Sequence, residues 1–152
     1  MNKVQTRVSV PPSDVFAVLS NGWLYPGWVV GASRMRQVDE SWPEVGSKLY
    51  HSVGNWPLLL DDTTSVHECV PDRRLVLRAR AWPGGEATVI VELEPDGDSG
   101  TRVSISEDVV EGPAKMIIGP VRRVLLRFRN RESLRRLRFL AEGGAEAARE
   151  SS

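Results

Sequence analysis

Two acidic side chains fall at positions where strand alternation would turn them toward an apolar interior. In the segment 101–110, Glu107 shares the phase of Ile105, and in the segment 58–70 the phase favours Asp62 over its acidic neighbour. Apolar surroundings would raise the pKa of either carboxyl group, so each could act as a general acid or base in enol or aldol chemistry. Alternatively, these carboxylates form ion pairs with arginines of the sheet or of the C-terminal helix, or lie at the rim of the sheet.

His51 is the third candidate, because it falls in phase with Leu49 and Val53. Histidine titrates close to neutral pH, so His51 could exchange protons with a ligand, although a neutral, hydrogen-bonded core histidine is the commoner outcome. The sequence contains no Ser-His-Asp, Cys-His or phosphate-loop arrangement. Its one cysteine and two histidines lack the spacing of a zinc site. We therefore expect neither a metal nor a cofactor.

Large aromatic residues crowd the segment NGWLYPGWVVGASR (21–34), where glycines and a proline interrupt regular structure. Trp23, Tyr25 and Trp28 cannot share one strand face, and the segment is short for a helix. These aromatic side chains could fill a core, or they could line the mouth of a pocket. In the second case the segment would cap one end of a cavity, with Trp23 and Tyr25 at the opening and Trp28 anchored beneath them.

The elements that position these residues are mainly strands. Short turns rich in Gly, Asp and Pro separate β-branched runs, which predicts an antiparallel meander of hairpins. Strands are expected over residues 4–10, 31–39, 47–54, 58–70, 75–82, 87–94 and 101–110. The last three have one apolar and one polar face, so another element must cover the apolar face.

Helices are expected before and after the meander in the sequence. A short helix follows the first strand, with Ser13 as its N-cap and Gly22 as its stop signal. A long helical pattern runs from about residue 113 to 142, with a break or restart at the Gly-Pro pair 119–120. Residues 143–152 have no core-forming pattern and are expected to be frayed or disordered.

The long helix carries two apolar stripes on nearly opposite sides. One contains Val121, Val124, Leu125 and Phe128, and the other contains Leu134, Leu137, Leu140 and Ala141. One regular helix cannot place both stripes against the same surface. Either the helix is buried on different sides along its length, or one stripe contacts a ligand or a partner chain, which would allow a homodimer. The pattern leaves open which face contacts the sheet.

Charge is unevenly distributed along the chain. Residues 1–112 hold ten Lys/Arg against sixteen Asp/Glu, whereas residues 113–152 hold ten against four, and eight arginines fall between positions 122 and 138. The favoured interpretation is a solvated face that pairs with the acidic sheet; the alternative is a basic amphipathic helix that contacts an anionic membrane or ligand. No recognised motif or aromatic-basic strand platform accompanies the arginines, so we do not expect nucleic-acid binding.

The length of 152 residues predicts one domain, placed at residues 1–142. No apolar run is long enough to span a bilayer, and the first residues lack the apolar block of a signal peptide. A cytoplasmic protein is therefore expected.

Several stretches resemble the START-like helix-grip superfamily. VSVPPSDVFAVLSN resembles its first strand and helix, and four others resemble its SRPBCC polyketide cyclase/dehydrase and lipid-transport branch: GWLYPGWVVGAS, WPEVGSKLYHSVG, WPLLLDDTT and RNRESLRRLRFLAE. The resemblance covers residues 3–142. It implies an α+β fold in which a curved antiparallel sheet wraps around a long C-terminal helix, with two short helices after the first strand.

The resemblance also implies a cavity between sheet and helix. The residues expected to contact its ligand are Trp23, Tyr25, Trp28, Leu49, His51, Leu60, Asp62, Leu77, Val89, Val91, Ile105, Glu107, Val121 and Phe128. The leading hypothesis is a protein that binds a hydrophobic or polycyclic, lipid- or polyketide-like molecule. The alternatives are a cyclase/dehydrase-type enzyme that uses Asp62, Glu107 or His51, and a module that contacts a membrane or a protein through the arginine-rich helix.

Overall fold

The structure is a computed structural model that describes residues 2–53, 60–81, 85–111 and 119–151. Seven antiparallel strands form one sheet in the order β1-β7-β6-β5-β4-β3-β2. Their bounds are β1 Asn2–Val8, β2 Ala32–Val38, β3 Lys48–Val53, β4 Leu60–Val70, β5 Arg74–Ala81, β6 Gly85–Asp96 and β7 Gly100–Glu111. Each strand from β2 to β7 therefore pairs with its neighbour in sequence, which confirms the predicted meander.

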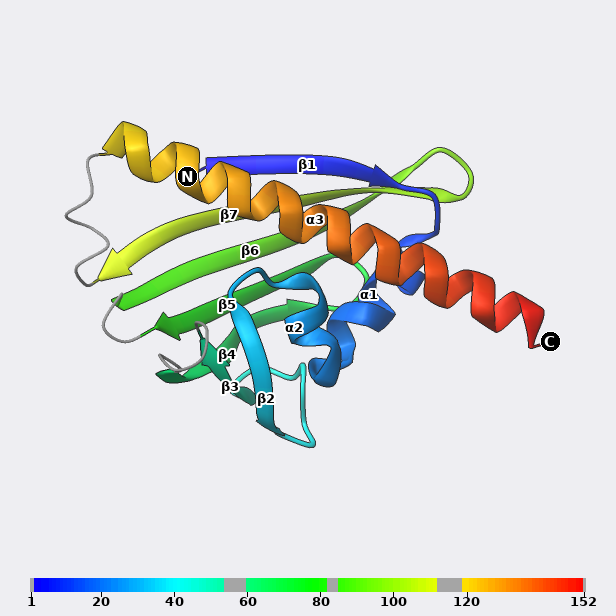
Figure 1. The fold of residues 1–152 in the computed structure, drawn as a ribbon. Coiled ribbons are helices and arrows are strands. Elements are labelled where there is room, and N and C mark those ends of the chain that lie inside the picture. The colour runs from blue at the N-terminus through cyan, green and yellow to red at the C-terminus, as the bar shows by residue number, and fades with distance from the viewer. Residues whose placement is uncertain (1, 54–59, 82–84, 112–118, 152) are drawn as a thin grey trace.

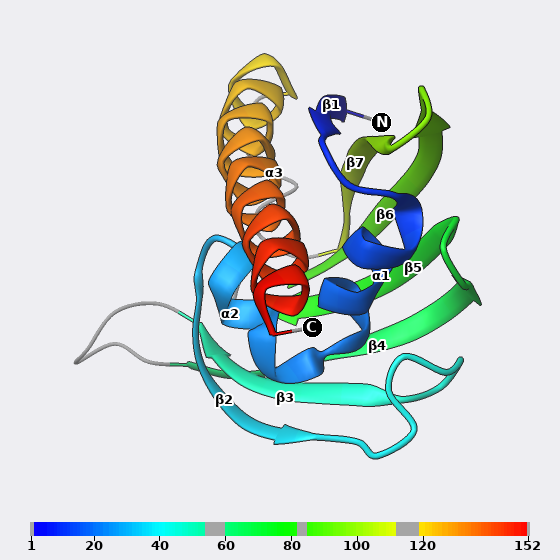
Figure 2. The same cartoon turned by 90° about the vertical axis from the view of Figure 1, so that its right-hand side faces the viewer.

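The sheet curves around the long helix α3, Gly119–Glu150, and this arrangement confirms the predicted α+β helix-grip fold (Figures 1 and 2). Three short helices join β1 to β2: α1 (Pro12–Ser20), the 3₁₀ turn η1 (Gly22–Leu24) and α2 (Tyr25–Trp28). Together with α3 they cover the concave face of the sheet (Figure 2).

Alternation along the strands creates the buried face. Val4, Ile105, Val91 and Leu75 are direct register partners across β1, β7, β6 and β5, and all four side chains are buried. Because successive residues of a strand point to opposite faces, one row of apolar partners fixes the inward phase of every strand that it crosses. The next inward row contains Glu107, which pairs with Val89. The alternation of β7 therefore places an acidic side chain in the interior.

Two details of the short helices differ from the prediction. α1 begins at Pro12 with Pro11 as its N-cap, so the prediction that Ser13 is the N-cap is wrong. No side chain caps this helix. Proline suits the first helical position because it lacks the N–H that would be left unpaired there. Gly22 has a packing role: a Cβ atom built there would lie 2.5 Å from Leu49 Cδ2 and 2.7 Å from Val38 Cγ1. The absence of a side chain lets η1 approach the sheet closely.

The long helix begins at the predicted Gly-Pro pair, and residues 113–118 of the expected helix lie outside the described residues. At its other end α3 continues to Glu150, so the expectation of a disordered tail over 143–152 is wrong for the described part of that segment. The segment contains strong helix formers after its two glycines, and Ala145 packs against the core.

The structure resolves which stripe of α3 faces the fold. Leu134, Leu137 and Ala141 are almost fully buried in the core. The stripe that contains Val121 and Phe128 points away from the sheet. The helix is therefore held through its second stripe, and its first stripe is left uncovered by the described residues.

Candidate functional site

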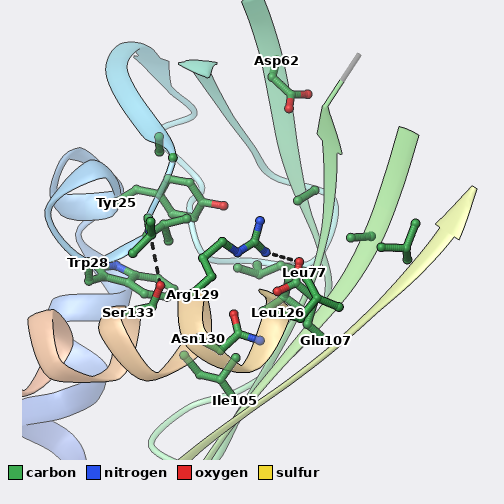
Figure 3. Close-up of a pocket in the computed structure, with 18 of the residues that line it drawn as sticks. Tyr25, Trp28, Asp62, Leu77, Ile105, Glu107, Leu126, Arg129, Asn130 and Ser133 are labelled. Atoms are coloured by element: carbon green, nitrogen blue, oxygen red, sulfur yellow. Dashed lines mark hydrogen bonds and ion pairs between the residues drawn. The ribbon is translucent and has the colours of Figure 1, made fainter. Parts of the chain in front are cut away.

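A cavity of about 280 Å³ lies between the concave face of the sheet, α2 and the N-terminal half of α3 (Figure 3). Eight of the residues expected to contact a ligand line it: Tyr25, Trp28, His51, Asp62, Leu77, Val89, Ile105 and Glu107. Most of the lining is apolar, and the polar groups are few, as in typical small-molecule sites. The role of these eight residues in ligand binding stays a prediction.

The other expected residues lie elsewhere. Leu49 and Val91 are fully buried in the core without lining the cavity, and the side chain of Leu60 lies outside the described residues. Trp23 is 60% exposed, so it does not close the cavity beside Tyr25. Val121 and Phe128 are 51% and 76% exposed, because α3 turns their stripe away from the sheet. The placement of these last three at the cavity is therefore wrong.

Glu107 faces the cavity from β7 and forms an ion pair with Arg129, which reaches toward it from α3 (Figure 3). The Glu107 side chain is 3% exposed, and Val89 and Leu77 are its successive register partners on β6 and β5. The pair with a helix arginine was one of the two outcomes expected for this carboxylate, and it is confirmed. Only one carboxylate oxygen is used, because Glu107 Oε2 has no hydrogen-bond partner among the described residues.

Thr64 joins His51 to Tyr25. Thr64 Oγ1 lies 2.9 Å from His51 Nε2 and 3.2 Å from the Tyr25 hydroxyl, and the tyrosine and histidine rings are 5.2 Å apart between centroids. Burial, followed by the positive charge of Arg36, lowers the pKa of His51 to about 4. His51 is therefore neutral at physiological pH. The hydrogen bond to Thr64 agrees with the alternative of a neutral, hydrogen-bonded core histidine, and the lowered pKa disfavours a role as an acid or base near neutral pH.

The Tyr25 side chain is also buried and packed at the cavity. Burial raises the pKa of its phenol to about 12, so the hydroxyl keeps its proton. The ring also packs edge-on against Trp28, with 5.5 Å between centroids. The pair confirms that the aromatic segment carries buried residues at the cavity, although through Tyr25 and Trp28 rather than through Trp23.

Asp62 is the direct register partner of His51 across β3 and β4, and its carboxyl group is buried at the cavity. Burial raises the pKa of Asp62 to about 6, against a smaller opposing effect of the Thr63 N–H, which donates to Oδ1 over 2.6 Å. The direction of this shift agrees with the rise in pKa that the sequence predicts for a carboxyl group on the apolar face.

A family model described as "Polyketide cyclase / dehydrase and lipid transport" matches residues 1–142. The chain belongs to this family. A search of curated proteins finds no significant match to the sequence. The match to the family model confirms the resemblance to the SRPBCC branch at the level of family and fold.

Solved structures agree with this assignment to the polyketide cyclase/dehydrase and lipid-transport family. NE0264 from Nitrosomonas europaea is 18% identical with a TM-score of 0.72, and the match covers 95% of each chain. The di-domain ARO/CYC proteins StfQ and BexL are each 14% identical, with TM-scores of 0.69 and 0.65. The chain spans about half the length of these two, with 52% of StfQ and 48% of BexL covered. At such identities the likeness shows the fold alone.

In this family member, α3 supplies cavity residues that the sequence analysis did not assign to the site: Leu126, Arg129, Asn130 and Ser133. Ser133 Oγ accepts a hydrogen bond from the Val30 N–H at 3.3 Å, which ties the loop after α2 to the helix (Figure 3). The signal available in the sequence is the helical period, which places Asn130 on the same side of the helix as Leu134. Had that stripe been taken as the inner one, Leu126 and Ser133 would have followed from the helical period.

Asn130 is almost fully buried, and its Nδ2 has no hydrogen-bond partner among the described residues. Within residues 2–53, 60–81, 85–111 and 119–151, no group of three or more His, Cys, Asp or Glu side chains could hold a metal ion. In the same ranges, no helix has the length and apolar character needed to cross a bilayer.

Proposed function

We propose that this protein binds a hydrophobic small molecule that carries hydroxyl or carbonyl groups, in the cavity between the sheet and α3. The observation that carries the proposal is a set of three buried polar atoms without a hydrogen-bond partner among the described residues: His51 Nδ1, Glu107 Oε2 and Asn130 Nδ2. All three belong to side chains that line the cavity. A buried polar group without a partner costs about 1–3 kcal/mol, and a ligand that satisfies such groups recovers that cost on binding.

The chemistry of two of these atoms indicates which groups the ligand carries. Asn130 Nδ2 is a donor and would meet a carbonyl or hydroxyl oxygen, whereas Glu107 Oε2 is an acceptor and would meet a hydroxyl group. Between them, Leu77, Val89 and Ile105 offer apolar contact for a ring system. An oxygenated polycyclic, polyketide-like molecule fits this pattern better than a plain hydrocarbon chain. The proposal includes the cytoplasmic location that the sequence predicts.

Two probes that differ by one hydroxyl group test this proposal: 2-naphthol and naphthalene, titrated calorimetrically or by fluorescence. We expect 2-naphthol to bind, and Asn130→Leu or Glu107→Gln to weaken it about 5- to 10-fold, the value of one hydrogen bond. The same variants should bind naphthalene no more weakly than the wild type. Gln37→Leu, at an exposed position of β2, is the control and should leave both affinities unchanged. Failure of both probes to bind the wild type would contradict the proposal.

A second candidate function is acid–base catalysis on the bound molecule, and the observation that favours it is Asp62. Its carboxyl group lies at the cavity and has a pKa of about 6, so it can accept and return a proton near neutral pH. A suitable reaction is proton removal next to a ketone, followed by carbon–carbon bond formation within the same molecule. Asp62→Asn should abolish turnover of a poly-β-ketone substrate while 2-naphthol still binds. Unchanged turnover would remove Asp62 as the base.

A further inference from the structure

One side of α3 carries a row of large apolar side chains that no described part of the chain covers. Val121, Val124, Leu125 and Phe128 are 51%, 60%, 56% and 76% exposed, and Phe139 continues the row at 66%. At the period of an α-helix these five positions fall within about 100° of one another, opposite the buried stripe. In Figure 1, α3 lies in front of the sheet, and no other element passes in front of the helix. We call these five residues the outer row.

The outer row is flanked by positive charge. Residues 119–131 contain five arginines and no acidic residue. Of these, Arg129 pairs with Glu107, whereas the side chains of Arg123, Arg127 and Arg131 form no ion pair with any of the described residues. The interpretation that the arginines pair with the acidic sheet thus does not account for these three.

We propose that the outer row docks this protein on a bilayer that contains anionic lipids. A helix that lies in the plane of a membrane needs an apolar side that enters the acyl boundary and basic side chains that reach the head groups beside it. Phe128 and Leu125 would provide the apolar contact, and Arg127 and Arg131 lie toward one edge of the row. Farther along, the Arg135 guanidinium lies 5.6 Å from the Phe139 ring centroid, but it is paired with Glu132, so the free positive charge is confined to the N-terminal part of the row.

Charge complementarity favours an anionic surface over a second copy of the chain. If two copies met through the outer row, Arg127 and Arg131 of each copy would lie near those of the other, and Glu132 on that side of the helix is already paired with Arg135 and Arg136. Anionic head groups supply the missing negative charge. The inner side of the same segment contributes Leu126 and Asn130 to the cavity, so docking would bring the cavity close to the membrane.

Vesicle flotation tests the proposal with the full chain. We expect the protein to bind phosphatidylcholine vesicles that contain phosphatidylglycerol at low salt, to bind pure phosphatidylcholine vesicles much more weakly, and to dissociate at high salt. The double variant Arg127→Gln/Arg131→Gln should bind about 30-fold more weakly, because each basic residue near an anionic surface contributes a factor of about 5. Phe128→Ser should weaken binding about tenfold or more, through lost apolar contact.

Matched controls use exposed residues away from α3. Arg34→Gln/Arg73→Gln removes the same charge, and Val45→Ser removes an exposed apolar side chain; both should bind like the wild type. The proposal fails if the wild type does not bind anionic vesicles at low salt, or if the control double variant loses as much affinity as Arg127→Gln/Arg131→Gln. It also fails if sedimentation shows a dimer that Phe128→Ser dissociates while vesicles remain unbound, because the occupant would then be a second copy.

Discussion

The two halves of α3 have different relations to the same sheet. From Leu134 onward, the inward positions Leu134, Leu137 and Ala141 are apolar and almost fully buried. Before Leu134, the inward side includes Arg129 and Asn130, which lie at the cavity. The comparison teaches that apolar packing is concentrated in one part of the helix. The other part carries buried polar groups at the cavity, and Asn130 Nδ2 among them has no hydrogen-bond partner in the described residues.

The largest expected effect compares one leucine from each half. Leu137→Ala should lower the free energy of unfolding by about 2–5 kcal/mol, because it opens a void in a packed core. Leu126→Ala should cost only about 1 kcal/mol, because this half-buried side chain already borders a cavity. Urea unfolding monitored by circular dichroism measures both. Equal losses would mean that the two halves are packed alike.

The next effect concerns pH, because the cavity holds two buried groups with opposite pKa shifts. Asp62 has a pKa raised from 3.8 to about 6, so between these values the folded protein holds a proton that the unfolded chain releases, and stability falls as pH rises. His51 has a pKa lowered from 6.5 to about 4, so between these values the unfolded chain takes up a proton that the folded protein refuses, and stability falls as pH drops. The two contributions oppose one another.

Single substitutions separate the contributions of Asp62 and His51 to the pH dependence of stability. Relative to the wild type, Asp62→Asn should gain stability at neutral pH, by about 3 kcal/mol at most, and this gain should disappear near pH 4. His51→Gln should show the reverse trend, with its stability relative to the wild type improving as the pH falls from 6.5 to 4. Denaturant unfolding across this range measures both differences. Differences that do not change with pH would show that neither group is buried as described.

The smallest effect lies at the boundary between core and cavity. Tyr25→Phe removes the hydroxyl that lies 3.2 Å from Thr64 Oγ1 and should cost about 1 kcal/mol, while the bond between Thr64 and His51 remains. Tyr50→Phe, at a half-buried position of β3, is the control and should cost less. Thermal unfolding of the two variants gives the comparison, and equal costs would show that the Tyr25 hydroxyl contributes no more to stability than the Tyr50 hydroxyl does.

The strand half of the site could be predicted from the sequence, and the helix half could not. Alternation places every second residue on the same face, so the apolar phase of β7 sufficed to bring Glu107 inward, and the same reasoning placed Asp62 and His51. A register partner that is apolar on the neighbouring strand reinforces each assignment. This alternation is a local property of each strand, and pairing into a sheet does not change which side chains share a face.

The rotation of α3 is set by contacts distant in sequence, and that explains the errors. Val121 and Phe128 form the more compact apolar stripe, but the fold buries the stripe with Leu137, which packs with α1, α2 and β1. Once the helix is turned that way, Arg129 meets Glu107. Trp23 was misplaced for a related reason: the backbone of the broken segment decides which aromatic side chain points inward, and spacing alone does not reveal it.

Methyl-resolved NMR during a titration with 2-naphthol tests the central claim, that the cavity is the binding site, most directly. We predict that the methyl signals of Leu77, Val89 and Ile105 shift together and saturate, while those of Val121, Val124 and Leu125 stay unchanged. The two sets lie on opposite sides of α3, so the result separates the cavity from the outer row. Saturable shifts confined to the second set, or no saturable shifts in the first, would contradict the account.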